Sequence, residues 1–148
     1  MRALIQRVNY TQVHVNGEVV GSIGTGLCVF LGVGEGDGTA QADKLWSKIS
    51  RMRIFPDNQG KTNLSMQDVG GELMVISQFT LYADCKKGNR PSFTQAGDPH
   101  KANDLYQYFI GLATQAGLDV ATGVFGADMK VRLENDGPFT IWLDTDYL

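Results

Sequence analysis

The sequence lacks the residues on which disulfide-bonded and metal-binding proteins depend. Its 148 residues include two cysteines, Cys28 and Cys85, which lie far apart and form no CxxC pair. This spacing excludes a disulfide framework, so we expect two free thiols in a reducing compartment. The two histidines, His14 and His100, stand apart from each other, and no zinc or two-metal ligand spacing occurs. We therefore expect no metal and no other cofactor.

Long apolar runs and excess positive charge are missing as well. The longest apolar stretch, Gly26–Val33, is far shorter than the roughly 20 residues that cross a bilayer, and the N-terminus has no signal-peptide core. These absences predict a cytoplasmic protein with no membrane partner. The net charge of −3 argues against a general nucleic-acid binder. A local basic patch at Lys86–Arg90 stays open, although a solvated loop explains the same residues.

The apolar residues that are present predict a single domain over residues 1–148. Asn16-Gly17, between two β-rich runs, predicts a tight hairpin with positive φ at both positions. Apolar residues at helical spacing predict an amphipathic helix over residues 39–53. A second helix should run from an N-cap at Asp98 to a stop at Gly117.

The remaining apolar segments predict strands. The segment at residues 26–33 should be buried on both faces, and further strands are expected at residues 71–83, 128–135 and 139–144. The last two strands flank the Gly137-Pro138 pair, which we call the Gly-Pro corner. The predicted fold is α+β, a mostly antiparallel, barrel-like sheet with two main helices packed on it.

Two short stretches stand out as candidates for a functional site. Ser77-Gln78-Phe79-Thr80 ends an otherwise apolar strand. Rigidly held polar groups suit a substrate site, but a strand end that ties its polar groups into a turn explains them equally well. Gly137-Pro138 offers neither a side-chain donor nor a proline N–H, so it is either a plain turn or a functional element made of backbone carbonyls. A serine triad is disfavoured because no GxSxG elbow occurs, and catalysis by Cys85 is disfavoured because no base stands near it in the sequence.

Taken together, the two stretches resemble signature motifs of the D-aminoacyl-tRNA deacylases. These motifs are SQFTL at Ser77–Leu81 and NDGPFT at Asn135–Thr140. The resemblance runs almost end to end, with similar segments ALIQRV at 3–8, GEVVGSIGTGL at 17–27, RIFPDNQGK at 53–61, RPSF at 90–93 and ADM at 127–129. Two motifs in the right order are far more specific than either alone.

This resemblance implies a cytoplasmic homodimer that hydrolyses the ester between a D-amino acid and the terminal adenosine of tRNA. It also implies activity on glycine mischarged on tRNA, because the site rejects L side chains rather than selecting D ones. Gly137 and Pro138 match the family's cis pair, which enters the partner subunit's pocket and turns both carbonyls toward the substrate's α-amino group. Arg7 resembles the arginine that braces this pair.

Residues that match the family's pocket follow from the same resemblance. Ser77, Gln78, Phe79 and Thr80 match the pocket motif. Three further residues fall where the family lines its adenosine and amino-acid pocket, although ordinary packing explains them equally well: Ala102, Phe125 and Met129.

The chemistry of hydrolysis leaves two routes open. Thr80 could be a nucleophile, but no neighbouring base is evident, and an unassisted hydroxyl is weak at neutral pH. We favour assistance by the tRNA's terminal 2′-hydroxyl, with the backbone N–H groups of Phe79 and Thr80 stabilising the oxyanion. The alternatives are a hydrolase of another acyl ester with Ser77 or Thr80 as nucleophile, and a tRNA-binding module without catalysis. Lys86, Lys87 and Arg90 are the first candidates to contact the tRNA body.

Overall fold

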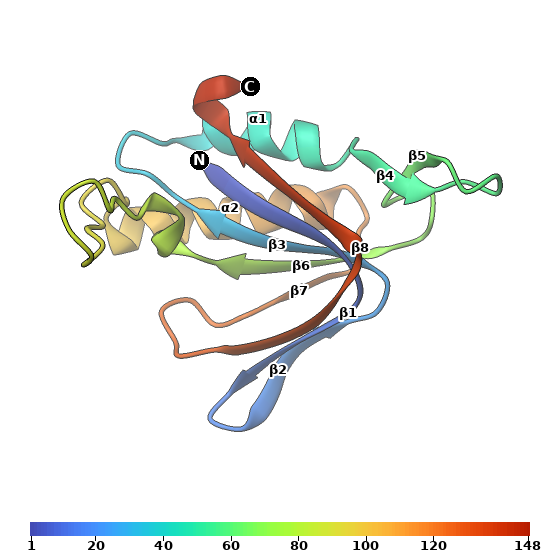
Figure 1. Cartoon of the computed structure of the whole chain (residues 1–148), viewed down its shortest axis with the longest axis horizontal. Coiled ribbons are helices and arrows are strands. Elements are labelled where there is room, and N and C mark those ends of the chain that lie inside the picture. Colours follow the sequence, from blue (N-terminus) through green and yellow to red (C-terminus); the bar gives the residue numbers. More distant parts are fainter.

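The two longest strands of the fold are β1 (Arg2–Val15) and β8 (Lys130–Asp144). They pair antiparallel along almost their whole length, and the computed structural model describes all residues from Met1 to Leu148. Both strands bend strongly, so that the sheet curls into a nearly closed, barrel-like shape (Figure 1). The chain ends in a short turn, η2 (Thr145–Tyr147).

The tight hairpin that the sequence predicts is confirmed. Asn16 has φ of 50° and Gly17 has φ of 82°, the positive values that a two-residue turn of this type requires. The turn joins β1 to β2 (Glu18–Ile23), which pairs antiparallel with β1.

One end of the sheet is parallel, which the sequence did not reveal. β3 (Gly26–Gly32) lies antiparallel to β1 but parallel to β6 (Glu72–Ser77), and β6 is parallel to β7 (Val120–Thr122). Parallel neighbours need long crossovers, and the helices α1 (Thr39–Ile49) and α2 (Pro99–Gln115) lie in them. The predicted class is confirmed: an α+β fold with a barrel-like sheet and two main helices.

The helix α2 (Pro99–Gln115) begins and ends as predicted. The Asp98 side chain accepts hydrogen bonds from the backbone N–H groups of His100 and Lys101, and Pro99 opens the first turn. Beyond the last turn, Gly117 has φ of 82°, a conformation suited to a residue that stops a helix.

The helix α1 (Thr39–Ile49) is shorter than predicted. Arg53 instead begins β4 (Arg53–Pro56), which pairs with β5 (Thr62–Ser65) in a separate hairpin. Ile54 and Phe55 are buried in this arrangement. Burial of these two side chains in the core therefore outweighs the local helical spacing.

Two apolar clusters stabilise the two faces of the sheet. The larger one packs both helices against one face, through residues such as Leu45, Phe109 and Leu27. The smaller one, which includes Cys28 and Met74, fills the inside of the curl made by β1, β2 and β8. No helix in the fold has both the length and the apolar character needed to span a membrane.

Candidate active site

The SQFT segment lies where β6 leaves the core. The strand is buried up to Ile76, and the backbone N–H of Gln78 still donates to the Leu31 carbonyl of β3 at 2.8 Å. The chain then closes into a single helical turn, η1 (Phe79–Tyr82). The Gln78 side-chain amide donates to the Thr80 hydroxyl across this turn. The polar groups thus form the turn that was one of the two expectations, and Ser77 and Gln78 also line a cavity.

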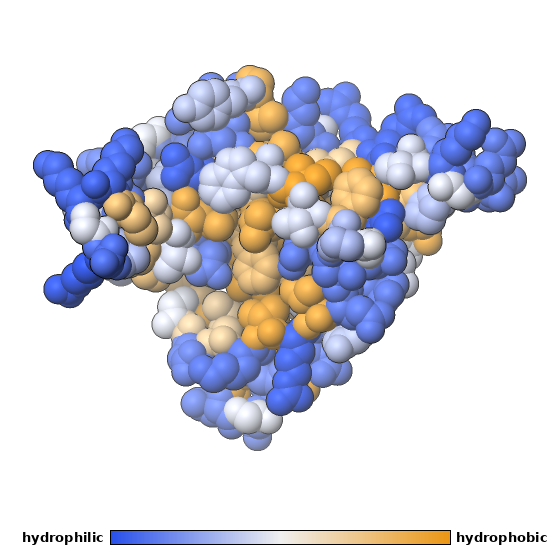
Figure 2. Space-filling model, in the orientation of Figure 1, coloured by the Kyte–Doolittle hydropathy of each residue, from blue (hydrophilic) through white to orange (hydrophobic).

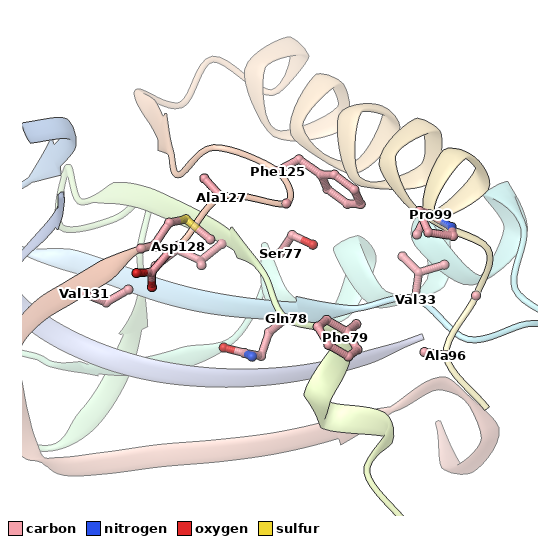
Figure 3. Close-up of a pocket in the computed structure, with 15 residues that line it drawn as sticks. Val33, Ser77, Gln78, Phe79, Ala96, Pro99, Phe125, Ala127, Asp128 and Val131 are labelled. Carbon is pink, nitrogen blue, oxygen red and sulfur yellow. The ribbon is translucent and has the colours of Figure 1, made fainter. Parts of the chain in front are cut away.

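This cavity has a volume of about 480 Å³ and lies between the end of β6, the start of α2 and the loop before β8. In Figure 3 the Ser77 hydroxyl lies in the space framed by Phe125, Pro99 and Val33. The walls of the cavity are largely apolar. They are formed by Val33, Ile76, Ser77, Gln78, Phe79, Ala96, Gly97, Pro99, Ala102, Phe125, Gly126, Ala127, Asp128, Met129 and Val131.

The cavity gathers six of the predicted site residues from three parts of the chain: Ser77, Gln78, Phe79, Ala102, Phe125 and Met129. Thr80 is not among the lining residues; it is exposed, and its hydroxyl bonds to Gln78. No pattern in the sequence pointed to the Ala96–Pro99 segment or to Val33 as part of the site. Pro99 was recognised as a helix start, but no pattern in the sequence placed that helix end beside β6.

The wall of the cavity carries very few charged groups. Asp128 is the one titratable side chain in the lining, and its carboxylate forms an exposed ion pair with Lys130 at 2.9 Å. No histidine, cysteine or lysine lines the wall. No group of three or more His, Cys, Asp or Glu side chains in the chain is placed to hold a metal ion. The chemistry available from the wall is therefore hydrogen bonding by Ser77, Gln78 and the backbone.

The η1 turn is held in place by contacts with Arg2 and Asp37. The Arg2 guanidinium donates to the Leu81 carbonyl at 3.0 Å, lies 4.2 Å from the centre of the Tyr82 ring and pairs with Asp144 at 2.8 Å. The Tyr82 hydroxyl donates to Asp37 at 3.1 Å. Burial, together with the neighbouring Asp37 carboxylate, raises the pKa of Tyr82, so its phenol keeps the proton that this bond requires. These contacts fix the position of the turn.

The Gly137-Pro138 corner lies away from this cavity. It belongs to β8, and it does not separate two strands as the sequence predicted; the strand continues through it with a local interruption of the pairing with β1. Gly137 and Pro138 are exposed, and the peptide bond between them is cis, as the resemblance implies. Arg7 lies beside the corner, where its Nε donates to the Asp136 carbonyl at 3.1 Å.

The basic residues Lys86, Lys87 and Arg90 lie on an exposed loop between η1 and α2. Paired backbone hydrogen bonds between Asp84 and Ser92, at 2.8 and 2.9 Å, close this loop. None of the three cations forms an ion pair with a carboxylate. The positive charges of this loop are therefore not neutralised by ion pairs within the chain.

Comparison with known proteins gives a consistent result. A family model described as D-Tyr-tRNA(Tyr) deacylase matches residues 4–144. A protein of Lactobacillus delbrueckii subsp. bulgaricus named D-aminoacyl-tRNA deacylase is 56% identical over 97% of this chain and 99% of its own. A protein of Thermosipho melanesiensis with the same name is 51% identical over 98% of this chain and 97% of its own.

Solved structures support the same fold. A structure titled c-Myc DNA Unwinding Element Binding Protein superposes with a TM-score of 0.92 at 37% identity, covering 97% of this chain and 98% of its own. A structure described as a probable eukaryotic D-amino acid tRNA deacylase superposes with a TM-score of 0.82, covering 96% of this chain and 97% of its own. At 18% identity, this second likeness concerns the fold alone.

Proposed function

The chain belongs to the D-Tyr-tRNA(Tyr) deacylase family, and from this premise we propose that its cavity receives the aminoacylated end of a D-aminoacyl-tRNA. It is an ester hydrolase, a D-aminoacyl-tRNA deacylase. The observation that carries the proposal is the composition of the cavity wall, which joins apolar surface for a side chain and an adenosine to a few hydrogen-bonding groups at the end of β6. We place its action in the cytoplasm, where aminoacyl-tRNA is used.

The direct test compares D-tyrosyl-tRNA with L-tyrosyl-tRNA after exhaustive chelation of metals. We expect rapid release of D-tyrosine, survival of this activity in chelator, and a far slower enzymatic release of L-tyrosine. Equal turnover of both substrates would refute chiral proofreading, and a trapped acyl-enzyme would support the rival hydrolase with a serine or threonine nucleophile. Binding without any turnover would favour a tRNA-binding module.

We propose that the hydrolysis is assisted by the substrate. The one titratable side chain of the wall, Asp128, is held in an exposed ion pair, so the wall offers no well-placed general base. The terminal 2′-hydroxyl of the tRNA can supply this function. Phe79 and Thr80 are the first residues of the η1 turn. The first N–H groups of a helical turn lack partners within the turn. The N–H groups of these two residues are therefore suited to stabilise the oxyanion.

Chirality would be enforced by the backbone at Gly137-Pro138. Backbone carbonyls accept hydrogen bonds from an α-ammonium group, and a corner without a long side chain can approach the α-carbon closely. An L side chain would meet this backbone, whereas a D side chain or the hydrogen of glycine would not. The same geometry therefore explains the proposed activity on mischarged glycyl-tRNA.

We propose that the corner acts on the pocket of a second copy. Gly137 and Pro138 do not line the cavity of their own chain, and Gly137 stands six positions along β8 from Val131 at the cavity wall, a length of strand of about 20 Å. The face that carries β1 and β8 displays a concentration of apolar side chains (Figure 2), and Tyr10 and Trp142 are 43% and 47% exposed on these strands. We propose that a homodimer covers this face and places each corner in the partner's cavity.

Subunit mixing tests the shared site. Gly137→Ala damages the corner and Ala102→Phe fills the cavity, so each homodimer should lose activity. After exchange of subunits, a mixed dimer contains one intact cavity facing one intact corner, and we expect about a quarter of the unmodified activity to return. Mixing two cavity variants, Ala102→Phe with Ala127→Phe, is the control and should restore nothing. Mixed dimers that form but stay inactive would exclude a site shared between subunits.

The basic loop is proposed to contact the tRNA body, and its cysteine provides the test. Cys85 is exposed beside Lys86, whereas Cys28 is buried and burial raises its pKa to about 12, so at neutral pH an alkylating reagent should modify Cys85 alone. Added tRNA should slow this modification several-fold at low salt, and the protection should fade as salt rises.

A variant without the loop's charges serves as the control for this experiment. Replacing Lys86, Lys87 and Arg90 together by alanine should abolish the protection, judged within each protein as the ratio of alkylation rates with and without tRNA. Unchanged protection in this variant, or no protection in the unmodified protein, would mean that the loop is only solvated.

A further inference from the structure

The backbone around Gly137-Pro138 leaves the ladder that joins β1 and β8. Val8 pairs with Asn135 and Gln6 pairs with Thr140, so β8 advances five residues while β1 advances two. The residues between these pairs therefore lose their partners on β1. Their backbone N–H and C=O groups must find other hydrogen bonds or face solvent.

Asn135 supplies hydrogen bonds on the C-terminal side of the corner. Its side-chain Oδ1 accepts from the Phe139 N–H at 2.8 Å, and its Nδ2 donates to the Phe139 carbonyl at 3.0 Å. One carboxamide thus satisfies both backbone groups of Phe139 and closes a ring over residues 135–139. These two hydrogen bonds replace the pairing with β1 that Phe139 lacks.

Arg7 holds the N-terminal side. Its Nε contacts the carbonyl and the carboxylate of Asp136 at 3.1 and 3.0 Å, and its guanidinium lies 4.8 Å from the centre of the Phe139 ring. Its Nη1 donates to the Ile54 carbonyl at 2.6 Å, which ties it to the β4–β5 hairpin. Asn135 is the one residue whose side chain hydrogen-bonds the backbone of residues 137–139.

We propose that Asn135 is a positioning residue that sets the orientation of the Gly137-Pro138 corner and thereby the discrimination between D and L substrates. This inference rests on the proposed function of the corner. Only a carboxamide presents a donor and an acceptor side by side, as the two groups of Phe139 require. A carboxylate in the same place would accept from the N–H but would turn a lone pair toward the carbonyl.

The test measures kcat/KM for D-tyrosyl-tRNA and L-tyrosyl-tRNA in Asn135→Asp and Asn135→Ala. We expect the ratio of the two values to fall about tenfold or more in each variant, as loss of one well-placed hydrogen bond allows. This ratio does not depend on how much of the protein is folded, since unfolding lowers both values equally. A purely structural role would therefore lower the melting temperature and leave the ratio unchanged.

Asn9→Ala is the matched control. The Asn9 amide is exposed on the same pair of strands and donates to the Glu134 carboxylate at 2.6 Å, so its loss removes a side-chain contact without touching the corner. Its ratio should equal that of the unmodified protein. If the ratio changes in Gly137→Ala but not in either Asn135 variant, the inference about Asn135 is wrong and the corner keeps its role. If Gly137→Ala leaves the ratio unchanged, the proposed function of the corner fails, and this inference fails with it.

Discussion

Replacing Gly137 by alanine is expected to lower the turnover of D-aminoacyl-tRNA about 100-fold, the effect that a displacement of about 1 Å in a positioned group can have. Gly137 has φ of 147°, in the region that L side chains rarely adopt. A Cβ atom at this position would lie 2.6 Å from the backbone nitrogen of Phe139 and 3.1 Å from its Cβ. The backbone must shift to relieve these contacts, and the corner shifts with it. Single-turnover release of D-tyrosine from tRNA measures the loss.

Gly60→Ala separates local strain from the loss of a functional corner. Gly60 also has a positive φ, of 76°, but it lies in the turn between β4 and β5, where an added Cβ atom would meet nothing within 4 Å beyond Gly60 and its two chain neighbours. This variant should carry the same kind of conformational cost, about 1 kcal/mol, and keep its activity. Full activity in a folded Gly137→Ala protein would remove the corner from the mechanism.

Removal of the terminal 2′-hydroxyl from the tRNA is expected to reduce hydrolysis by about 10²–10⁴-fold, the contribution of a general acid or base. The substrate for this measurement carries D-tyrosine on the 3′-oxygen of a terminal 2′-deoxyadenosine. In contrast, Thr80→Ala should slow turnover less than about tenfold, because the Thr80 hydroxyl lies outside the cavity lining and is bonded to Gln78. Its backbone N–H, which the mechanism uses, survives the substitution.

The two routes to hydrolysis predict opposite patterns in this pair of measurements. If Thr80 were the nucleophile, Thr80→Ala would abolish turnover, and the deoxy substrate would react almost normally. Ser77→Ala is a useful companion variant, because Ser77 lines the cavity and would be the nucleophile of the rival acyl-ester hydrolase. Retention of most activity in both alanine variants would leave the substrate as the source of catalysis.

Local interactions explain why parts of the fold could be predicted. The φ preferences of Asn16 and Gly17 and the N-cap at Asp98 act within a few residues, so their outcome is visible in the sequence. The predicted end of the first helix was wrong because the burial of Ile54 and Phe55 depends on a core that distant segments build. The same limit applies to β8, where pairing with β1 carries the strand through the Gly-Pro corner.

The sequence by itself determined the class of the fold, the two motifs, and six of the residues that gather at the cavity: Ser77, Gln78, Phe79, Ala102, Phe125 and Met129. The tertiary structure alone decided that Thr80 stands outside the cavity lining, and that the Ala96–Pro99 segment forms part of it. It alone decided as well that Asn135 closes the corner through Phe139. Residue type and spacing encode local backbone preference, whereas these outcomes depend on the register between strands and on how α2 docks against β6. Those are set by packing among residues far apart in the chain.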